Sequence, residues 1–154
     1  MTTSLREKLA ADWKWGTLSK DNAALALGEL AEFDDDEVKA LLEEAKFKEP
    51  VNGRFLSFWL GFLGGGRFYK GDKTWGKVAI ANTCLIILVV LLTYVLQLDK
   101  SVDEILGFCF IPSALFIIYS HSLDGQFVFV GIQKDNMKKF LATLEKYKAK
   151  KGKK

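Results

Sequence analysis

Residues 64–76 read Gly-Gly-Gly-Arg-Phe-Tyr-Lys-Gly-Asp-Lys-Thr-Trp-Gly and stand between a short apolar run, 55–63, and a long one, 78–96. The long run has nineteen residues and no charge. A helix of that length rises about 28 Å, close to the roughly 30 Å of hydrocarbon in a bilayer. We therefore expect 78–96 to be a transmembrane helix and the glycine-rich stretch to be a turn at the membrane surface.

The short apolar run leaves two interpretations open. A helix of about a dozen residues rises about 18 Å, so this run crosses a bilayer only if flanking apolar residues join it. Otherwise it is a re-entrant or interfacial segment. Gly61 and Gly65 form a pair of small residues four positions apart, which lets another helix approach closely.

A third apolar region, 105–132, follows a short acidic loop at 97–104. As one helix this region would run about 42 Å, which exceeds the hydrocarbon thickness. We therefore expect a tilt or a kink, and Pro112 and Gly125 are the natural positions for a kink.

Residues 1–50 differ from the rest of the chain in charge and in pattern. They carry 7 basic and 12 acidic residues, whereas 51–154 carry 15 basic and 7 acidic. Apolar residues recur at helical spacing in three short stretches, and Asp34 followed by Glu37 has the spacing of a capping box. This part is predicted to be an acidic soluble unit of three short helices, and its first residues lack the apolar core of a cleavable signal peptide.

The stretch 134–154 holds nine lysines together with apolar residues that share one helical face. The apolar residues are Met137, Phe140, Leu141, Leu144 and Tyr147. A helix of this kind can lie on an anionic membrane surface, and basic segments next to membrane spans mark the cytoplasmic side. We therefore expect lipid contacts and no nucleic acid partner. The lysines expected at the lipid interface are Lys138, Lys139, Lys146 and Lys148.

The segments together predict an all-α chain with an integral membrane hairpin or bundle of two to three membrane segments. The expected domains are the acidic unit at 1–50, a membrane domain at 51–133 and a basic amphipathic tail at 134–154. The positive-inside rule places the tail and the basic loop at 67–77 in the cytoplasm, as in a multi-pass protein of a bacterial inner membrane. The acidic unit is outside if the first run crosses and inside if it re-enters; the flanking Lys46, Lys48 and Arg54 favour the inside.

Residue types that build catalytic and metal sites are scarce. Cys84 and Cys109 lie inside apolar runs, and no phosphate-binding or dinucleotide-binding glycine pattern follows a strand pattern. We therefore predict a protein that is not an enzyme, with no metal and no cofactor. His121, the one histidine, would share a helix face with Asp124 as a proton-relay partner, or it would only form a structural hydrogen bond.

The glycine-rich turn carries a family resemblance. Residues 64–71 followed by Gly76 resemble the signature of the TM2 domain family, and Leu123-Asp124 is similar to the second mark of that family. The resemblance covers about residues 54–132 and implies a small membrane module rather than a particular chemistry. The residues assigned to the turn and to helix packing are Gly61, Gly64, Gly65, Gly66, Phe68, Tyr69, Gly71 and Gly76.

Arg67 and Asp124 are the candidate polar pair of the membrane domain. A carboxylate inside an apolar segment is costly unless it is paired, protonated or hydrated. We hypothesise that Arg67 pairs with Asp124 and holds the turn against the last helix. The alternative is that Asp124 lies at a water-exposed kink with Gly125 and Gln126.

Two functions are compatible with this architecture. The first is a module that binds a protein partner, or further copies of itself, through glycine-lined helix faces while it is held in the bilayer. The alternative is a pore-forming or ion-permeable oligomer of the holin type. A pore would need a polar stripe along a membrane helix, and the run 78–96 offers almost none.

Overall fold

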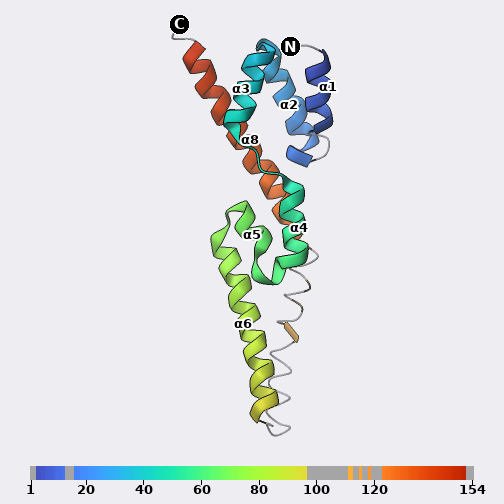
Figure 1. The fold of residues 1–154 in the computed structure, drawn as a ribbon, viewed down its shortest axis with the longest axis vertical. Helices are drawn as coiled ribbons and strands as arrows, with labels where there is room; N and C mark the ends of the chain where they lie inside the picture. The colour runs from blue at the N-terminus through green and yellow to red at the C-terminus, as the bar shows by residue number, and fades with distance from the viewer. Residues whose placement is uncertain are drawn as a thin grey trace. The chain divides into compact units, whose positions relative to one another are not determined.

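The computed structural model describes residues 3–12, 16–96, 111, 112, 115, 118 and 123–151, and its regular elements there are helices (Figure 1), so the all-α prediction is confirmed. The chain divides into two compact units. Unit 1 consists of Met1–Val51 and Phe129–Lys154, and unit 2 is Asn52–Val128. The first and last of the three expected segments therefore belong to one unit.

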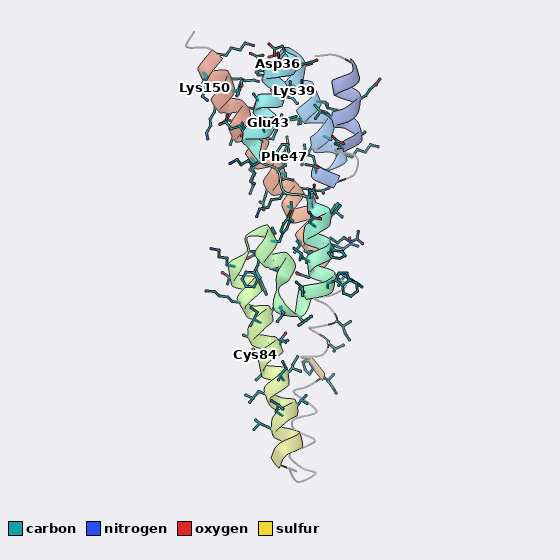
Figure 2. All side chains as sticks on the ribbon, viewed as in Figure 1. Asp36, Lys39, Glu43, Phe47, Cys84 and Lys150 are labelled. Atoms are coloured by element: carbon teal, nitrogen blue, oxygen red, sulfur yellow. The ribbon has the colours of Figure 1, made fainter. Side chains whose placement is uncertain are left out.

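Unit 1 contains the three short helices expected near the amino terminus. They are α1 (Thr3–Asp12), α2 (Lys20–Glu29) with the 3-10 turn η2 (Leu30–Glu32), and α3 (Asp35–Ala45). The capping box at the start of α3 is confirmed: the Glu37 backbone N–H donates to Asp34 Oδ1 at 2.8 Å, and the Asp34 N–H donates to Glu37 Oε2 at 3.2 Å. The charged residues Asp36, Lys39 and Glu43 line the exposed side of α3 (Figure 2).

The long helix α8 (Asp124–Lys151) completes the core of unit 1. Its residues Met137, Phe140 and Leu144 are buried in one cluster with apolar residues of α1, α2 and α3. Tyr147 is partly buried against the same cluster. Four of the five apolar residues that the sequence assigned to a membrane surface therefore pack in the protein's own core, whereas Leu141 is exposed. The expected tail at 134–154 is therefore part of unit 1, and a lipid contact of its lysines stays a prediction.

Two lysines of α8 contact residues of the amino-terminal segment. Lys148 Nζ lies 2.8 Å from Glu29 Oε2, and Lys139 Nζ donates to the Lys46 carbonyl at 3.1 Å. Lys138 and Lys146 are exposed. The ion pair between Lys148 and Glu29 thus neutralises part of the charge of the basic helix.

Asn136 is a structural residue of unit 1 that the sequence analysis did not identify. Its side chain is buried; Nδ2 donates to the carbonyls of Lys48 at 2.7 Å and Thr17 at 2.9 Å, while Oδ1 accepts the Lys48 N–H at 3.0 Å. One amide thereby ties two loops of the amino-terminal segment to α8. An asparagine within an otherwise apolar helix face was the available signal.

In unit 2 the first apolar run does not continue as one helix. The helix α4 (Pro50–Leu60) ends in the 3-10 turn η3 (Gly61–Leu63), and after Gly64 the short helix α5 (Gly65–Lys70) begins. Gly61 and Gly65 therefore do not share a helix, and the spacing that suggested a packing face is instead part of a turn. Gly64, between η3 and α5, has φ +69°, a left-handed conformation that favours glycine.

The helix α6 (Lys73–Leu96) contains the long apolar run. Within the described residues it is the one helix long and apolar enough to cross a membrane, over Lys73–Leu92, and only 11% of that window is buried inside the protein. A core helix of a soluble protein of this hydropathy would be mostly buried. Cys84 lies exposed on this helix (Figure 2). The acidic loop, Cys109 and His121 lie outside the described residues.

Candidate functional site

Arg67 lies in α5, where the glycine-rich turn sends its side chain toward the first residue of α8. A β-carbon on Gly66 would collide with the Ser57 hydroxyl and would lie 2.7 Å from the Gly53 carbonyl oxygen, so α5 can approach α4 this closely only with glycine at that position. The contact between the turn at Gly64 and α6 is also close, because a β-carbon on Gly64 would lie 2.6 Å from the Gly76 α-carbon. These contacts set the position of Arg67.

Asp124 is the partner of Arg67. Arg67 Nε donates to Asp124 Oδ1 at 2.7 Å, and Arg67 Nη2 bonds the same oxygen. Asp124 is only 7% exposed and is the acidic residue of the first turn of α8, where a carboxylate also interacts favourably with the helix dipole. The structure thus brings together the two residues proposed to pair, and it places Asp124 away from solvent rather than at an open kink.

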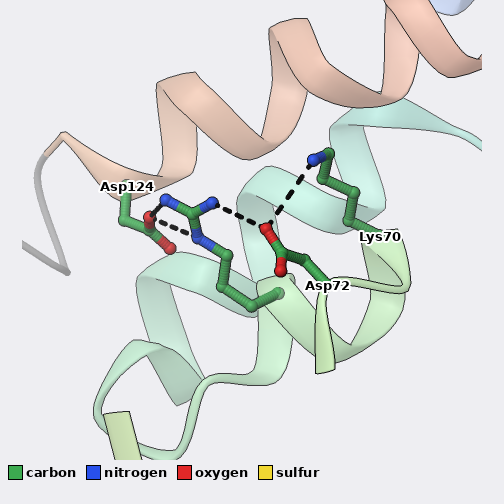
Figure 3. Close-up of polar contacts among 4 residues, drawn as sticks. Lys70, Asp72 and Asp124 are labelled. Carbon is green, nitrogen blue, oxygen red and sulfur yellow. Dashed lines mark hydrogen bonds and ion pairs between the residues drawn. The ribbon is translucent and has the colours of Figure 1, made fainter. Parts of the chain in front are cut away.

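Three further residues complete the cluster, and the sequence analysis did not assign them. Arg67 Nη1 lies 3.3 Å from Asp72 Oδ2, and Lys70 Nζ lies 3.9 Å from the same oxygen (Figure 3). The indole of Trp75 lies under the guanidinium, with Arg67 Cζ 5.8 Å from the ring centroid. All three residues follow Arg67 within eight positions, so the local sequence contained the signal.

The four charged side chains form a neutral cluster of two cations and two carboxylates. Their side chains are between 10% and 26% exposed, so the charges are largely withdrawn from water. Arginine stays protonated in proteins and presents several donors at once, which suits a residue that bridges two carboxylates. The chemistry of the cluster is therefore that of a fixed electrostatic link between α5, the start of α6 and the start of α8.

The other residues assigned to the turn have structural places around this link. Gly71 caps α5 with φ +107°, and its N–H donates to the Arg67 carbonyl at 3.0 Å. The Phe68 ring lies against Gly76, where a β-carbon would lie 2.7 Å from the ring. Tyr69 is half-buried, and Gly61 is buried in η3.

The surface around the cluster is apolar. In unit 2 the described residues that are large, apolar and exposed lie on every helix, including Phe55, Phe58 and Trp59 on α4 and Leu85, Ile87 and Leu88 on α6. Apart from Val128, the described buried residues of unit 2 are small or polar, and they include Gly53, Ser57, Gly66, Gly125 and Asp124. Large exposed apolar patches are typical of surfaces that contact lipid or another protein.

Among the described residues, no group of three or more histidine, cysteine, aspartate or glutamate side chains could hold a metal ion. Comparisons of the chain with known protein families, with curated proteins and with solved structures found no match. The resemblance to the TM2 domain family consequently rests on the residues of the turn and on Leu123-Asp124 alone.

Proposed function

We propose that this chain is a multi-pass membrane protein that is not an enzyme and that acts as an assembly module, similar to TM2 domain proteins. In this proposal unit 2 is embedded in lipid, and unit 1 is a water-soluble domain that binds a protein partner or a further copy of the chain. The observation that carries the proposal is the arrangement of unit 2, which exposes aliphatic and aromatic side chains while it buries glycines and an ion pair. Lipid tolerates exposed aliphatic and aromatic side chains, whereas an ion pair exposed to lipid is unfavourable.

Unit 1 supports the second half of the proposal. It has its own apolar core and a charged surface, which are the properties of a domain that folds in water. A soluble domain attached to a membrane module is a suitable docking part, since the bilayer holds it at one place while its surface stays accessible. In this proposal the cluster around Arg67 holds the membrane helices in one arrangement.

The alternative of a pore receives less support from α6. Between Val78 and Leu92 the exposed side chains are mainly aliphatic, and the residues include no charge. The polar Thr83 is half-buried, and its hydroxyl donates to the Phe62 carbonyl at 2.5 Å. Its polar group is therefore used within unit 2 rather than presented to a water-filled channel.

Reconstitution into liposomes tests the proposal. The full chain should float with liposomes after an alkaline carbonate wash, should not release a trapped dye, and should show energy transfer between differently labelled copies or retain an added partner through unit 1. Removal from the liposomes by carbonate would contradict membrane embedding. Release of the dye at low protein-to-lipid ratio would favour the pore.

A further inference from the structure

We propose that α4, η3 and α5 form a re-entrant hairpin that enters and leaves one leaflet, with the aromatic face of α4 in the headgroup region of the cytoplasmic leaflet. This inference rests on the membrane insertion of unit 2 proposed above. It adds the side of the membrane on which residues 1–50 lie, which the sequence alone left open.

The first argument is the parity of membrane crossings. Unit 1 is assembled from Met1–Val51 and Phe129–Lys154, two segments that flank unit 2 in the chain. Residues of both segments, such as Leu41 and Phe140, are buried in one apolar core. Segments that share a core in water lie on the same side of a membrane. The chain between them therefore crosses the bilayer an even number of times.

The second argument assigns those crossings. The helix α6 provides one, because it is long and apolar enough by itself. We assign the return, from the sequence, to the stretch between the end of α6 and the start of α8, where the apolar sequence 105–119 has fifteen residues. As a helix that stretch would rise about 22 Å, so together with its flanking residues it can cross once, and it is too short to cross twice. With two crossings assigned, the segment α4 to α5 contributes none.

The geometry of the hairpin agrees with this count. The helix α4 has 11 residues, which rise about 16 Å, roughly half of the hydrocarbon thickness. After η3 and Gly64 the chain turns back along α4: a β-carbon on Gly65 would meet Leu60, and one on Gly66 would meet Ser57 and Gly53. Later residues of α5 thus lie beside earlier residues of α4 (Figure 1).

The distribution of aromatic and basic residues identifies the leaflet region. On α4 the exposed residues Phe55, Phe58 and Trp59 share one face. Tryptophan and tyrosine favour the boundary between headgroups and acyl chains, and the rings of Phe55 and Phe58 pack against Trp59. Basic residues favour the cytoplasmic side. Five of the six basic residues of unit 2 lie in the same part of the chain as these aromatics: Arg54, Arg67, Lys70, Lys73 and Lys77. An anionic cytoplasmic leaflet complements their charge.

Labelling from the two sides of sealed vesicles tests the topology in the full chain. In a background with Cys84→Ala and Cys109→Ala, single cysteines are introduced by Ser4→Cys, Lys73→Cys and Ser101→Cys and exposed to a membrane-impermeant maleimide. The first two should react only from the cytoplasmic side and the third only from the opposite side. Reaction of Ser4→Cys and Lys73→Cys from opposite sides would overturn the hairpin while leaving membrane insertion intact. Loss of the protein from the vesicles would overturn both proposals.

A depth measurement tests the aromatic face separately. A fluorophore attached through Phe58→Cys should be quenched several-fold more strongly by lipids with a shallow nitroxide than by lipids with a deep one. The same fluorophore at Leu88→Cys, on α6, is the matched control and should show the reverse order. Deep quenching at both positions would show that α4 crosses the bilayer. Quenching at residue 58 by neither lipid would show that a protein covers this face, which would also overturn the inference.

Discussion

Unit 1 and unit 2 have the same length, 77 residues each, but unit 1 carries 16 basic and 14 acidic residues where unit 2 carries 6 and 5. In unit 1 the buried side chains are large and apolar, such as Leu30, Leu41 and Phe140. In unit 2 the described large apolar side chains are mostly exposed, and Asp124 is buried. The described large apolar side chains are therefore mainly buried in unit 1 and mainly exposed in unit 2.

The contrast shows that burial alone does not identify what stabilises a fold, because the surrounding solvent decides which residues are stable at the surface. Water drives Phe140 into the core of unit 1 by the hydrophobic effect. In the lipid environment proposed for unit 2 no such force acts between helices, so unit 2 would depend on close packing at glycines and on polar links such as Arg67 with Asp124. The same kind of substitution should therefore have unequal effects in the two units.

The largest effect is expected in the core of unit 1. Phe140→Ala removes a fully buried ring at the contact between α8 and the amino-terminal helices and should lower the free energy of unfolding of unit 1 by about 3–5 kcal/mol. Phe58→Ala, at a ring that is 58% exposed, leaves no internal cavity and should change stability little. Thermal unfolding in detergent followed by limited proteolysis measures both. Equal losses for the two variants would contradict the assignment of their environments.

A lysine at an exposed leucine should separate the two surfaces. Leu25 on α2 is 54% exposed and Leu88 on α6 is 51% exposed, so the pair is matched in residue type and exposure. Leu88→Lys should cost about 2.5–3.5 kcal/mol of membrane insertion, because a charge at the middle of a membrane helix is unfavourable. Leu25→Lys should stay within about 0.5 kcal/mol, as is usual for a surface position in water. The fraction of each variant recovered in membranes gives the comparison.

The ion pair of unit 2 should be stronger than a surface pair of unit 1. Arg67→Gln leaves Asp124 without its partner and should destabilise unit 2 by about 3 kcal/mol, the lower end of the cost of breaking a buried pair. Asp124→Asn should cost less, because Asp72 remains for the guanidinium. Combining the two substitutions should recover much of the loss.

The control for the ion pair is Asp36 with Lys39, whose side chains are 98% and 63% exposed at a distance of 3.9 Å. A double-mutant cycle with alanine there should give a coupling of about 0.5 kcal/mol or less. Unfolding in detergent, monitored by circular dichroism, measures both cycles. A coupling between Arg67 and Asp124 as small as that of the control would show that the pair does not hold unit 2 together.

Asn136 should have an effect of about 1–3 kcal/mol, because Asn136→Leu leaves the Lys48 N–H and carbonyl without their side-chain partner. The loop that contains Lys46 and Lys48 should then become a site of rapid trypsin cleavage. Gln133→Met, which removes a single hydrogen bond to the Gly16 carbonyl, is the control and should leave the loop more protected. Unchanged protection in Asn136→Leu would contradict the role given to this amide.

The smallest effect concerns alkaline pH. The hydrogen bond to Glu29 raises the pKa of Lys148 above its ordinary 10.5, and the hydrogen bond to Glu37 does the same for the pKa of Lys151. Because both values are raised in the folded state, the stabilisation is complete below pH 10.5 and is lost as the pH rises through the raised values. Both lysines are at the surface, so the loss should be slight.

The midpoint of thermal unfolding between pH 8 and pH 12 measures this alkaline loss. The double variant Lys148→Met with Lys151→Met should lack that part of the alkaline decrease, whereas Lys146→Met should retain it. An unchanged profile in the double variant would show that these two ion pairs do not contribute.

Local pattern was sufficient to predict much of unit 1 and of the turn. Helical spacing predicted α1, α2 and α3, and the capping box at Asp34 and Glu37 follows from two residues three positions apart. The length and apolar composition of the run from Val78 predicted α6. The sequence predicts the pairing of Arg67 with Asp124 because a carboxylate in an apolar segment needs a partner and Arg67 enters the membrane domain from the same side as Asp124.

Other features depend on residues far apart in the chain and had no local signal. The apolar face of α8 could serve a membrane surface or a core, and only the presence of α1 to α3 beside Phe140 decides between them. The end of α4 at Leu60 follows from the conformation of Gly64 and its crossing with Gly76 rather than from hydropathy. Asn136 likewise has its partners about 90 and 120 positions away.

The most direct test is the environment of Leu25 and Leu88 measured in one reconstituted sample. Nitroxide labels attached through Leu25→Cys and Leu88→Cys, with the native cysteines replaced, are relaxed by a water-soluble nickel chelate and by oxygen, which concentrates in lipid. If the two units lie in different solvents, relaxation by the chelate should be the stronger at residue 25 and relaxation by oxygen the stronger at residue 88. The same preference at both positions would contradict the account, because unit 2 would then be exposed to the same solvent as unit 1.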